Sequence, residues 1–409
     1  MRPSSSGSEP GLFDGVLARG PVRDEVGDTA WVAAMLEVES ALARAGAEAG
    51  LVPAEAAVAI ATACRAVRVD MLRLADETPA SGNPVVPLVA ALREALPADA
   101  AGYVHKGATS QDILDSAAML VFRRALAPLL ADLHGASDAA ASLALAHRDT
   151  PMAGRTLLQQ ALPTTFGLKA AGWMVALDEA ATRLAEVGRY RLAVQLGGAA
   201  GTLSALAPAG LRVLARIAEL LDLAEPLLPW HTDRTRPAEL ATALGMAAGV
   251  MGKVARDVTL LAQNEVGEVA EGAPGGSSAM AHKRNPVAAV SAAACAAQAP
   301  GLVATMLAAM PHEHERAAGA WHAEWRPLPQ LLVAVGSSAA WLRDCLEHLV
   351  VDPAAMRRNL DALLRVLGEA EPDVGSAGAL VDRALVAHPG VVDASASLRA
   401  DHEAQRERP

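Results

Sequence analysis

Residues 275–286 read Gly-Gly-Ser-Ser-Ala-Met-Ala-His-Lys-Arg-Asn-Pro, and the next 24 residues, up to Met310, carry no charged side chain. The glycines predict a loop, and Pro286 suits the first turn of a helix. Two hydroxyls, an imidazole, an ammonium, a guanidinium and an amide lie between Ser277 and Asn285. Such a loop can carry a proton and hold an anion, which suits chemistry beside a carboxylate. A disordered Gly/Ser linker is the alternative, but linkers seldom place six polar groups directly before a helix.

The composition predicts an all-α protein. Of the 409 residues, 52% are hydrophobic but only 3% are aromatic. Alanine and leucine, which favour helices, carry the apolar content, and the alternation typical of strands is scarce. A chain of this length exceeds one simple core. We expect a helical N-terminal domain over 1–104, a bundle of long helices over 105–349, and a small C-terminal region over 350–409.

The charge and the cysteines exclude several classes of protein. A net charge of −11 argues against general binding to nucleic acid or to an anionic membrane. The three cysteines have no metal-type spacing, and their odd number predicts reduced thiols in a cytoplasmic protein. No nucleotide-binding glycine motif is present, so we expect neither a cofactor nor a metal. The uncharged segment 286–310 is long enough to cross a bilayer, but Pro300-Gly301 interrupts it, which favours a kinked, buried helix.

A second polar segment, 105–112, reads His-Lys-Gly-Ala-Thr-Ser-Gln-Asp. Thr109 and Asp112 have the spacing of a capping box and predict a long helix from about Ser110 to His147. Hydroxyls and backbone N–H groups at a helix start attract anions, because that end carries partial positive charge. We therefore take His105, Thr109 and Ser110 as candidates for substrate binding. A plain helix cap is the alternative when this segment is considered alone.

Three more segments supply cations. In residues 151–160, Arg155 and Gln159 could hold a carboxylate by charge-assisted hydrogen bonds, although a surface arginine beside a turn is an equal alternative. Residues 229–236 and 312–326 gather cations beside tryptophans, and Arg234 and Arg316 are the better candidates there for substrate carboxylates. A metal site at His312 and His314 is improbable, because alternating histidines lack helical i, i+4 spacing.

Taken together, these segments resemble the fumarase/aspartase superfamily, whose mobile loop is written G-S-S-x-M-P-x-K-x-N-P. Ala281 stands where that pattern has proline. Within the superfamily the chain is most similar to the bacterial 3-carboxy-cis,cis-muconate cycloisomerases. This similarity extends over nearly all of residues 12–370 and rests on the segments 105–117, 151–173, 195–203, 229–236 and 275–286.

The resemblance implies a long central bundle between two small helical domains. It also implies a homotetramer in which loops from three subunits form each active site. The activity implied is the closure of 3-carboxy-cis,cis-muconate, a small polycarboxylate, to 4-carboxymuconolactone. Position in the family loop assigns proton transfer to Ser277 and charge stabilisation to Lys283 and Asn285. The other carboxylates would be bound by the remaining candidates: His105, Thr109, Ser110, Arg155, Gln159 and Arg316.

Two alternatives stay open. One is a related lyase that splits a C–N or C–O bond and releases fumarate from a succinyl substrate of the adenylosuccinate, argininosuccinate or nitrosuccinate type. Leu157 counts against the branches that use a histidine as proton donor, because it occupies that histidine's position. The other is a helical scaffold without activity, which the presence of Ser277, Lys283 and Asn285 opposes.

Overall fold

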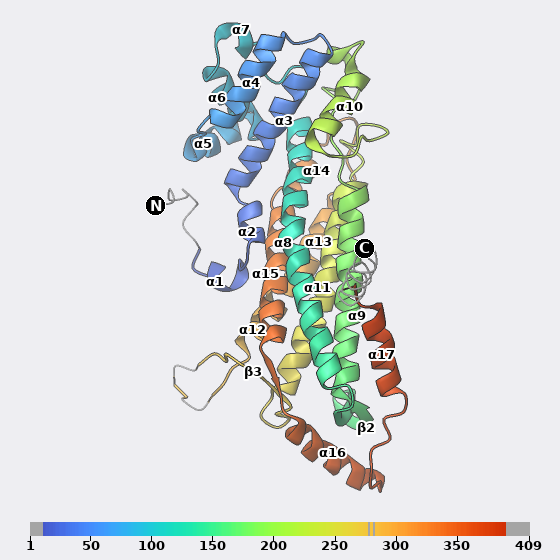
Figure 1. Ribbon diagram of the computed structural model, residues 1–409. Coiled ribbons are helices and arrows are strands. Elements are labelled where there is room, and N and C mark those ends of the chain that lie inside the picture. Colours follow the sequence, from blue (N-terminus) through green and yellow to red (C-terminus); the bar gives the residue numbers. More distant parts are fainter. Residues whose placement is uncertain (1–10, 277–278, 281–282, 390–409) are drawn as a thin grey trace, which may run out of the picture.

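The computed structural model describes residues 11–276, 279–280 and 283–389. The fold is all-α, as predicted, with long helices running side by side through the middle of the molecule (Figure 1). The longest, α8, spans Ser110–Ala146 and is about 55 Å long at 1.5 Å per residue. It packs against α9 (Phe166–Tyr190) and α15 (Pro327–Glu347), and α11 (Thr235–Leu261) closes the bundle against α9 and α15.

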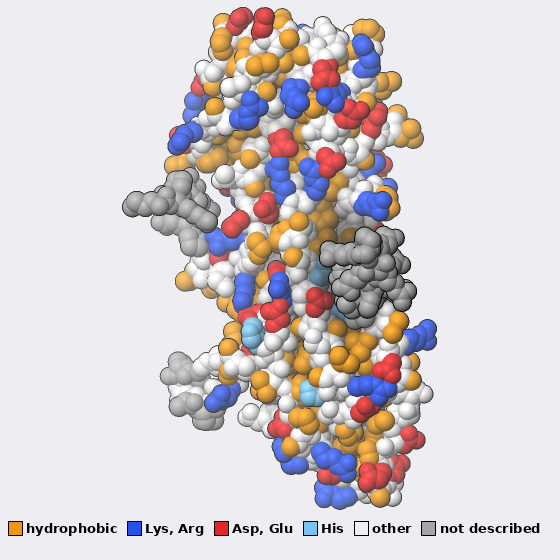
Figure 2. Space-filling model, viewed as in Figure 1, with side chains coloured by type: hydrophobic (Ala, Val, Ile, Leu, Met, Phe, Trp, Pro, Cys, Tyr) orange, Lys and Arg blue, Asp and Glu red, His pale blue; other side chains and the backbone are white. Residues whose placement is uncertain are grey.

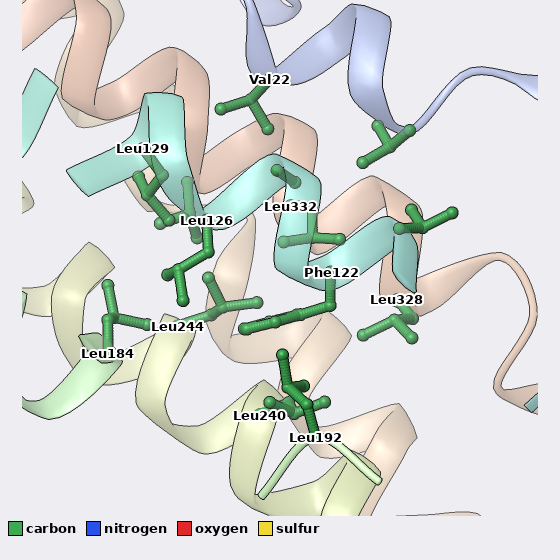
Figure 3. Close-up of a cluster of buried hydrophobic side chains, with 14 of the residues drawn as sticks. Val22, Phe122, Leu126, Leu129, Leu184, Leu192, Leu240, Leu244, Leu328 and Leu332 are labelled. Carbon is green, nitrogen blue, oxygen red and sulfur yellow. The ribbon is translucent and has the colours of Figure 1, made fainter. Parts of the chain in front are cut away.

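The core of the bundle is built mainly from aliphatic side chains, with a few fully buried aromatic rings, among them Phe122 of α8 and Phe166 and Trp173 of α9. Phe122 of α8 is fully buried and lies among leucines from α8, α11 and α15 (Figure 3). The helices approach closely because alanines line their contacts. Ala125, Ala136 and Ala140 of α8 are all completely buried. The low aromatic content therefore fits a core of closely packed helices with small side chains between them.

A smaller group of helices covers one end of the bundle (Figure 1). Its long member, α3 (Asp28–Glu48), packs against α4, α8 and α10. The others are short: α4 (Ala54–Ala66), α5 (Met71–Ser81), α6 (Val85–Glu94), α7 (Ala98–Ala101), the 3-10 turn η1 (Ser204–Leu206) and α10 (Gly210–Leu221). The first two helices, α1 (Asp14–Leu17) and α2 (Val22–Glu25), instead pack along the bundle against α15.

The opposite end carries the strands and the last helices. Strands β1 (Pro151–Thr156) and β2 (Gln159–Thr165) form an antiparallel hairpin, and β3 (Val269–Glu271) pairs with β4 (Leu349–Val351). Helix α16 (Pro353–Leu367) packs on the hairpin, and α17 (Ala377–Ala387) returns along α9 and α8. The sequence predicted only a polar loop over 151–160, so the hairpin is a correction.

The uncharged segment forms two helices rather than one kinked helix. Helix α12 (Val287–Ala296) ends before Gln298, and α13 (Ala299–Ala308) begins directly after it. Pro300 lies in the first turn of α13, where a missing N–H costs nothing, so the break falls earlier than expected. By length and composition Val287–Ala308 could cross a bilayer, but 39% of its most apolar 18-residue stretch is buried inside the protein. One such segment is weak evidence for a membrane.

Candidate active site

The N-terminus of α8 is held by a buried carboxylate. Asp112 is fully buried and accepts a hydrogen bond from the Thr109 N–H at 3.0 Å, completing the predicted capping box. It also accepts bonds from the backbone N–H groups of Gly197 and Gly198, at 3.1 and 2.8 Å. Burial raises the pKa of Asp112, and these bonds only partly offset that rise. Asp112 thus fastens the glycine-rich loop 197–201 onto the first turn of α8.

Gln195 extends this arrangement. Its side-chain N–H₂ donates to Asp112 at 3.0 Å, and its carbonyl oxygen accepts the Trp230 N–H at 2.7 Å. Gln195 is 1% exposed. The contact between Gln195 and Asp112 could not be predicted from the sequence, because the two residues are 83 positions apart and leave no local pattern.

Arg316 lies at the same end of α8, although it is 205 residues away from Gln111 in the sequence. Its guanidinium donates to the Gln111 side-chain oxygen at 3.1 Å and to the Gly198 carbonyl, and lies 3.7 Å from Asp112. The structure therefore brings Arg316 together with Thr109 and Ser110, whose side chains are partly exposed. We call this group, Thr109, Ser110, Gln111 and Arg316, the α8 half-site.

His105 lies at this end but is already engaged. Its Nδ1 lies 2.6 Å from a carboxylate oxygen of Glu39, and its backbone N–H donates to the other oxygen at 3.1 Å. Glu39 belongs to α3 and is 1% exposed. His105 thus ties the small helical region to the half-site, with a left-handed backbone at φ 64°.

Arg234 corrects one sequence interpretation. It is 3% exposed, and its guanidinium donates to both oxygens of Asp115, at 2.7 and 3.0 Å, and to both oxygens of Glu324, at 2.9 and 2.5 Å. The prediction that Arg234 binds a substrate carboxylate is wrong, because two carboxylates of its own chain enclose it. Trp321 adds a hydrogen bond to Asp115 at 3.1 Å. This cluster of Arg234, Asp115 and Glu324 is linked to the half-site through Gln111, whose side-chain N–H₂ donates to Asp115.

The β1–β2 hairpin carries Arg155 and Gln159. Arg155 donates to both oxygens of the buried Glu268, at 2.9 and 2.7 Å. A substrate carboxylate at Arg155 would therefore have to share the guanidinium with Glu268. Gln159 is exposed. At the tip, Leu157 and Leu158 have left-handed backbones, with φ of 50° and 66°, and are 97% and 72% exposed.

The polar segment 275–286 is described at residues 275–276, 279–280 and 283–286, and its two ends leave the side of the bundle together (Figure 1). Gly275 and Asn285 close its neck by exchanging backbone hydrogen bonds, both at 2.9 Å, and the Asn285 amide donates to the Gly276 carbonyl at 3.1 Å. Lys283 is exposed, with its backbone N–H bonded to the Met280 carbonyl at 3.1 Å. Ser277 lies outside the described residues.

The first turn of α12 follows this loop and is stabilised by an anion that the sequence did not reveal. Glu271, on β3, is 8% exposed and accepts the backbone N–H groups of Ala288 and Ala289, at 3.1 and 2.8 Å. A carboxylate there complements the positive end of the helix.

Within one chain these groups do not converge. Thr109 and Ser110 begin α8, whereas Arg155 and Gln159 lie beyond its other end, about 55 Å away by the length of the helix. The described ends of the loop 275–286 leave the bundle near the hairpin end, because β3 directly precedes Gly275 and Glu268 pairs with Arg155 of the hairpin (Figure 1). Across the described ranges, no group of three or more His, Cys, Asp or Glu side chains is placed to hold a metal ion.

Comparison with known proteins gives a consistent result. A family model described as lyase matches residues 18–301. Over 357 residues the chain is 50% identical to the 3-carboxy-cis,cis-muconate cycloisomerase of Bradyrhizobium diazoefficiens, covering 86% of this chain and 79% of that protein. Over 365 residues it is 47% identical to the nitrosuccinate lyase of Streptomyces davaonensis, covering 86% and 77%. The crystal structure of the 3-carboxy-cis,cis-muconate lactonizing enzyme from Pseudomonas putida superposes with a TM-score of 0.85 at 39% identity, covering 92% and 98%.

Proposed function

We propose a function from one premise: the chain belongs to the lyase family whose model its residues 18–301 match. The chain is a 3-carboxy-cis,cis-muconate cycloisomerase of aromatic catabolism, in the protocatechuate branch. The observation that carries this proposal is the close similarity, over most of the chain, to enzymes of that name. The α8 half-site supports it, because a hydroxyl-bearing helix start beside Arg316 suits a carboxylate ligand.

The reaction joins two parts of one molecule. A carboxylate oxygen of the substrate forms a bond to a carbon of the conjugated diene, and the π electrons of the broken double bond move onto a neighbouring carboxylate. A proton then adds to the adjacent carbon, which completes the lactone. No electron acceptor and no second substrate is needed. The protein must hold the reacting groups in register and stabilise the transient charge.

The roles of the residues follow from position in the loop and from charge. Ser277 transfers the proton, and Lys283 with Asn285 steadies the carboxylate that takes up the charge. Thr109, Ser110 and Arg316 bind a second carboxylate at the α8 half-site. Three further side chains complete the set by binding or by positioning: His105, Arg155 and Gln159.

The active form in this proposal is a cytoplasmic homotetramer with active sites shared between subunits. The separation of about 55 Å between the half-site and the hairpin supports it, because only loops from different copies can bring such groups together. Apolar side chains are also left exposed on the long helices, as Figure 2 shows on one face. Val175 of α9 is 37% exposed, Met246 of α11 is 50% exposed and Val290 of α12 is 50% exposed. Such residues suit a buried interface between copies.

Turnover of 3-carboxymuconate tests the proposal. The parent protein should consume the substrate, seen as loss of ultraviolet absorbance, and NMR should identify 4-carboxymuconolactone. Ser277→Ala should lose most of kcat with little change in KM, the pattern of an interaction made in the transition state. Lys283→Met should impair both. Ser142→Ala, at an exposed serine near the C-terminal end of α8, is the matched control. Unchanged turnover in Ser277→Ala would remove that serine from the mechanism.

A second candidate is a lyase that acts on nitrosuccinate. The 47% identical relative of that name favours it, and Ala281 departs from the proline of the family loop. Incubation with nitrosuccinate separates the two, since only the lyase would release fumarate.

A further inference from the structure

His231 is a buried imidazole that the proposed mechanism leaves unused. Its residue is 8% exposed. Its Nδ1 is inaccessible to solvent and has no hydrogen-bond partner within the described part of the chain, and the same holds for Nε of Arg316. A buried polar atom without a partner is costly, so two of them close together indicate a missing ligand or water.

The surrounding chain holds His231 in place on both sides. Trp230 donates its backbone N–H to Gln195 at 2.7 Å and its indole N–H to the Val194 carbonyl at 2.9 Å. The Gln111 side chain donates to the His231 carbonyl at 2.7 Å and accepts from Arg316 at 3.1 Å. His231 and Arg316 therefore flank one amide in the first turn of α8.

The imidazole lies over the glycine-rich loop that Asp112 fastens to this turn. A Cβ built on Gly201 would stand 2.8 Å from Cε1 of His231, so only glycine leaves room for the ring. Gly201 also has a left-handed backbone, at φ 81°. The ring therefore packs directly against the loop that Asp112 holds to the first turn of α8.

The electrostatic surroundings keep the imidazole neutral at pH 7. Burial lowers the pKa of His231 and the positive charge of Arg316 lowers it further; Asp115 opposes them, Arg234 adds a smaller lowering effect, and the net shift is downward. A neutral imidazole has one N–H to donate. Beside Arg316 and the positive end of α8, the matching acceptor is an anion.

We propose that His231 is a substrate-binding residue that donates a hydrogen bond to the carboxylate held between Arg316 and the first turn of α8. This inference rests on the proposed function, because it names a further contact of the same substrate. One carboxylate placed there accepts from His231 and from Nε of Arg316, and so satisfies both buried nitrogens.

Two substitutions separate this role from a structural one. His231→Ala removes the donor, whereas His231→Asn keeps an N–H donor near the position of Nδ1. Loss of a hydrogen bond to a charged group should raise KM for 3-carboxymuconate by about 10- to 100-fold in His231→Ala, with a much smaller change in kcat. His231→Asn should recover most of that loss. His348→Asn, an exposed histidine at the end of α15, is the matched control.

Binding of tricarballylate, a tricarboxylate probe, supplies a readout that does not depend on turnover. Calorimetry should show weaker binding in His231→Ala than in the parent, and recovery in His231→Asn. If the parent binds the probe but does not turn over 3-carboxymuconate, the proposed function fails while the contact stands. The contact is overturned if His231→Ala keeps KM and probe affinity within twofold of the parent. It is equally overturned if His231→Asn folds but is as impaired as His231→Ala.

Discussion

Replacing Arg234 by methionine should be among the most destabilising single changes in this protein. The guanidinium is 3% exposed and is the cation between Asp115 and Glu324, which are themselves 4% and 5% exposed. Removing it leaves two buried carboxylates without the cation between them, although Asp115 keeps its hydrogen bonds from Gln111 and Trp321 and His312 stays 3.5 Å from Glu324. Breaking a buried ion pair in this way costs about 3–5 kcal/mol of unfolding free energy.

The chain contains a matched exposed control. Arg73 has the same pattern of partners, with one bond to Glu77 at 2.8 Å and two to Glu94 at 3.0 Å, but its side chain is 49% exposed. Water and salt screen that arrangement, so Arg73→Met should barely move the urea midpoint. The comparison tests the effect of burial, since each guanidinium lies between two carboxylates but only that of Arg234 is enclosed.

The pH dependence gives a second check. In the parent, burial raises the pKa of Glu324, but His312 and Arg234 outweigh burial and hold that pKa below its ordinary value. The contribution of Glu324 to the free energy of unfolding is therefore present above its unfolded pKa, and it is lost as the pH falls through its folded pKa. Without Arg234 only His312 opposes the effect of burial on Glu324, so we expect the folded pKa of Glu324 to rise and the loss of stability to be larger at high pH than after acidification.

Urea unfolding of the parent, Arg234→Met and Arg73→Met at pH 8 and pH 5 measures both effects. The difference between parent and Arg234→Met should narrow at pH 5, and adding Asp115→Asn with Glu324→Gln should recover much of the loss. A midpoint loss no larger than that of Arg73→Met, or one that does not change with pH, would refute the reasoning.

Two further perturbations test the other end of the molecule. His388 is 4% exposed and lies 2.8 Å from Asp178 and 2.9 Å from Asp138; burial lowers its pKa, but the two carboxylates outweigh burial and raise it. The stabilisation of α17 by His388 is therefore present below pH 6.5 and is lost as pH rises through the folded pKa of His388. His388→Gln should speed hydrogen exchange of the α17 amides more at pH 6 than at pH 9. Equal effects at the two pH values would contradict this. Replacing Leu157-Leu158 by Asn-Gly supplies the residues that a two-residue turn with two positive φ angles favours, and should stabilise the protein by about 1 kcal/mol or more in thermal unfolding. Turnover should fall if the leucines reach a partner's active site, and a lower melting temperature would show that the turn is not strained.

The long helices were readable from the sequence because their apolar residues recur with helical spacing. The helix predicted from about Ser110 to His147 is Ser110–Ala146, and the next long helix is Phe166–Tyr190. The hairpin between them was not predicted. Its strands are short and contain glycine and proline, and its stability depends on packing against α16, which lies about 200 residues later.

In the candidate site, too, contacts between neighbouring residues could be predicted and contacts between distant residues could not. The capping box of Thr109 and Asp112 was visible locally, since both partners lie within four residues. The position of Arg316 at the same helix end was not visible, because its partner Gln111 is 205 residues away. The role of Arg234 was misread for the same reason, since a free guanidinium and an enclosed one have the same sequence signature.

By itself, the sequence determined the helical class, the starts of the main helices and the polar segments that carry chemistry, because caps, breakers and hydrophobic periodicity act between neighbours in the chain. Only the tertiary structure decided which charged groups are enclosed and which remain available to a ligand. Burial and pairing depend on side chains brought together from distant positions. Two outcomes could not be read from any local pattern: Arg234 is enclosed by two carboxylates, and Nδ1 of His231 has no hydrogen-bond partner among the described residues.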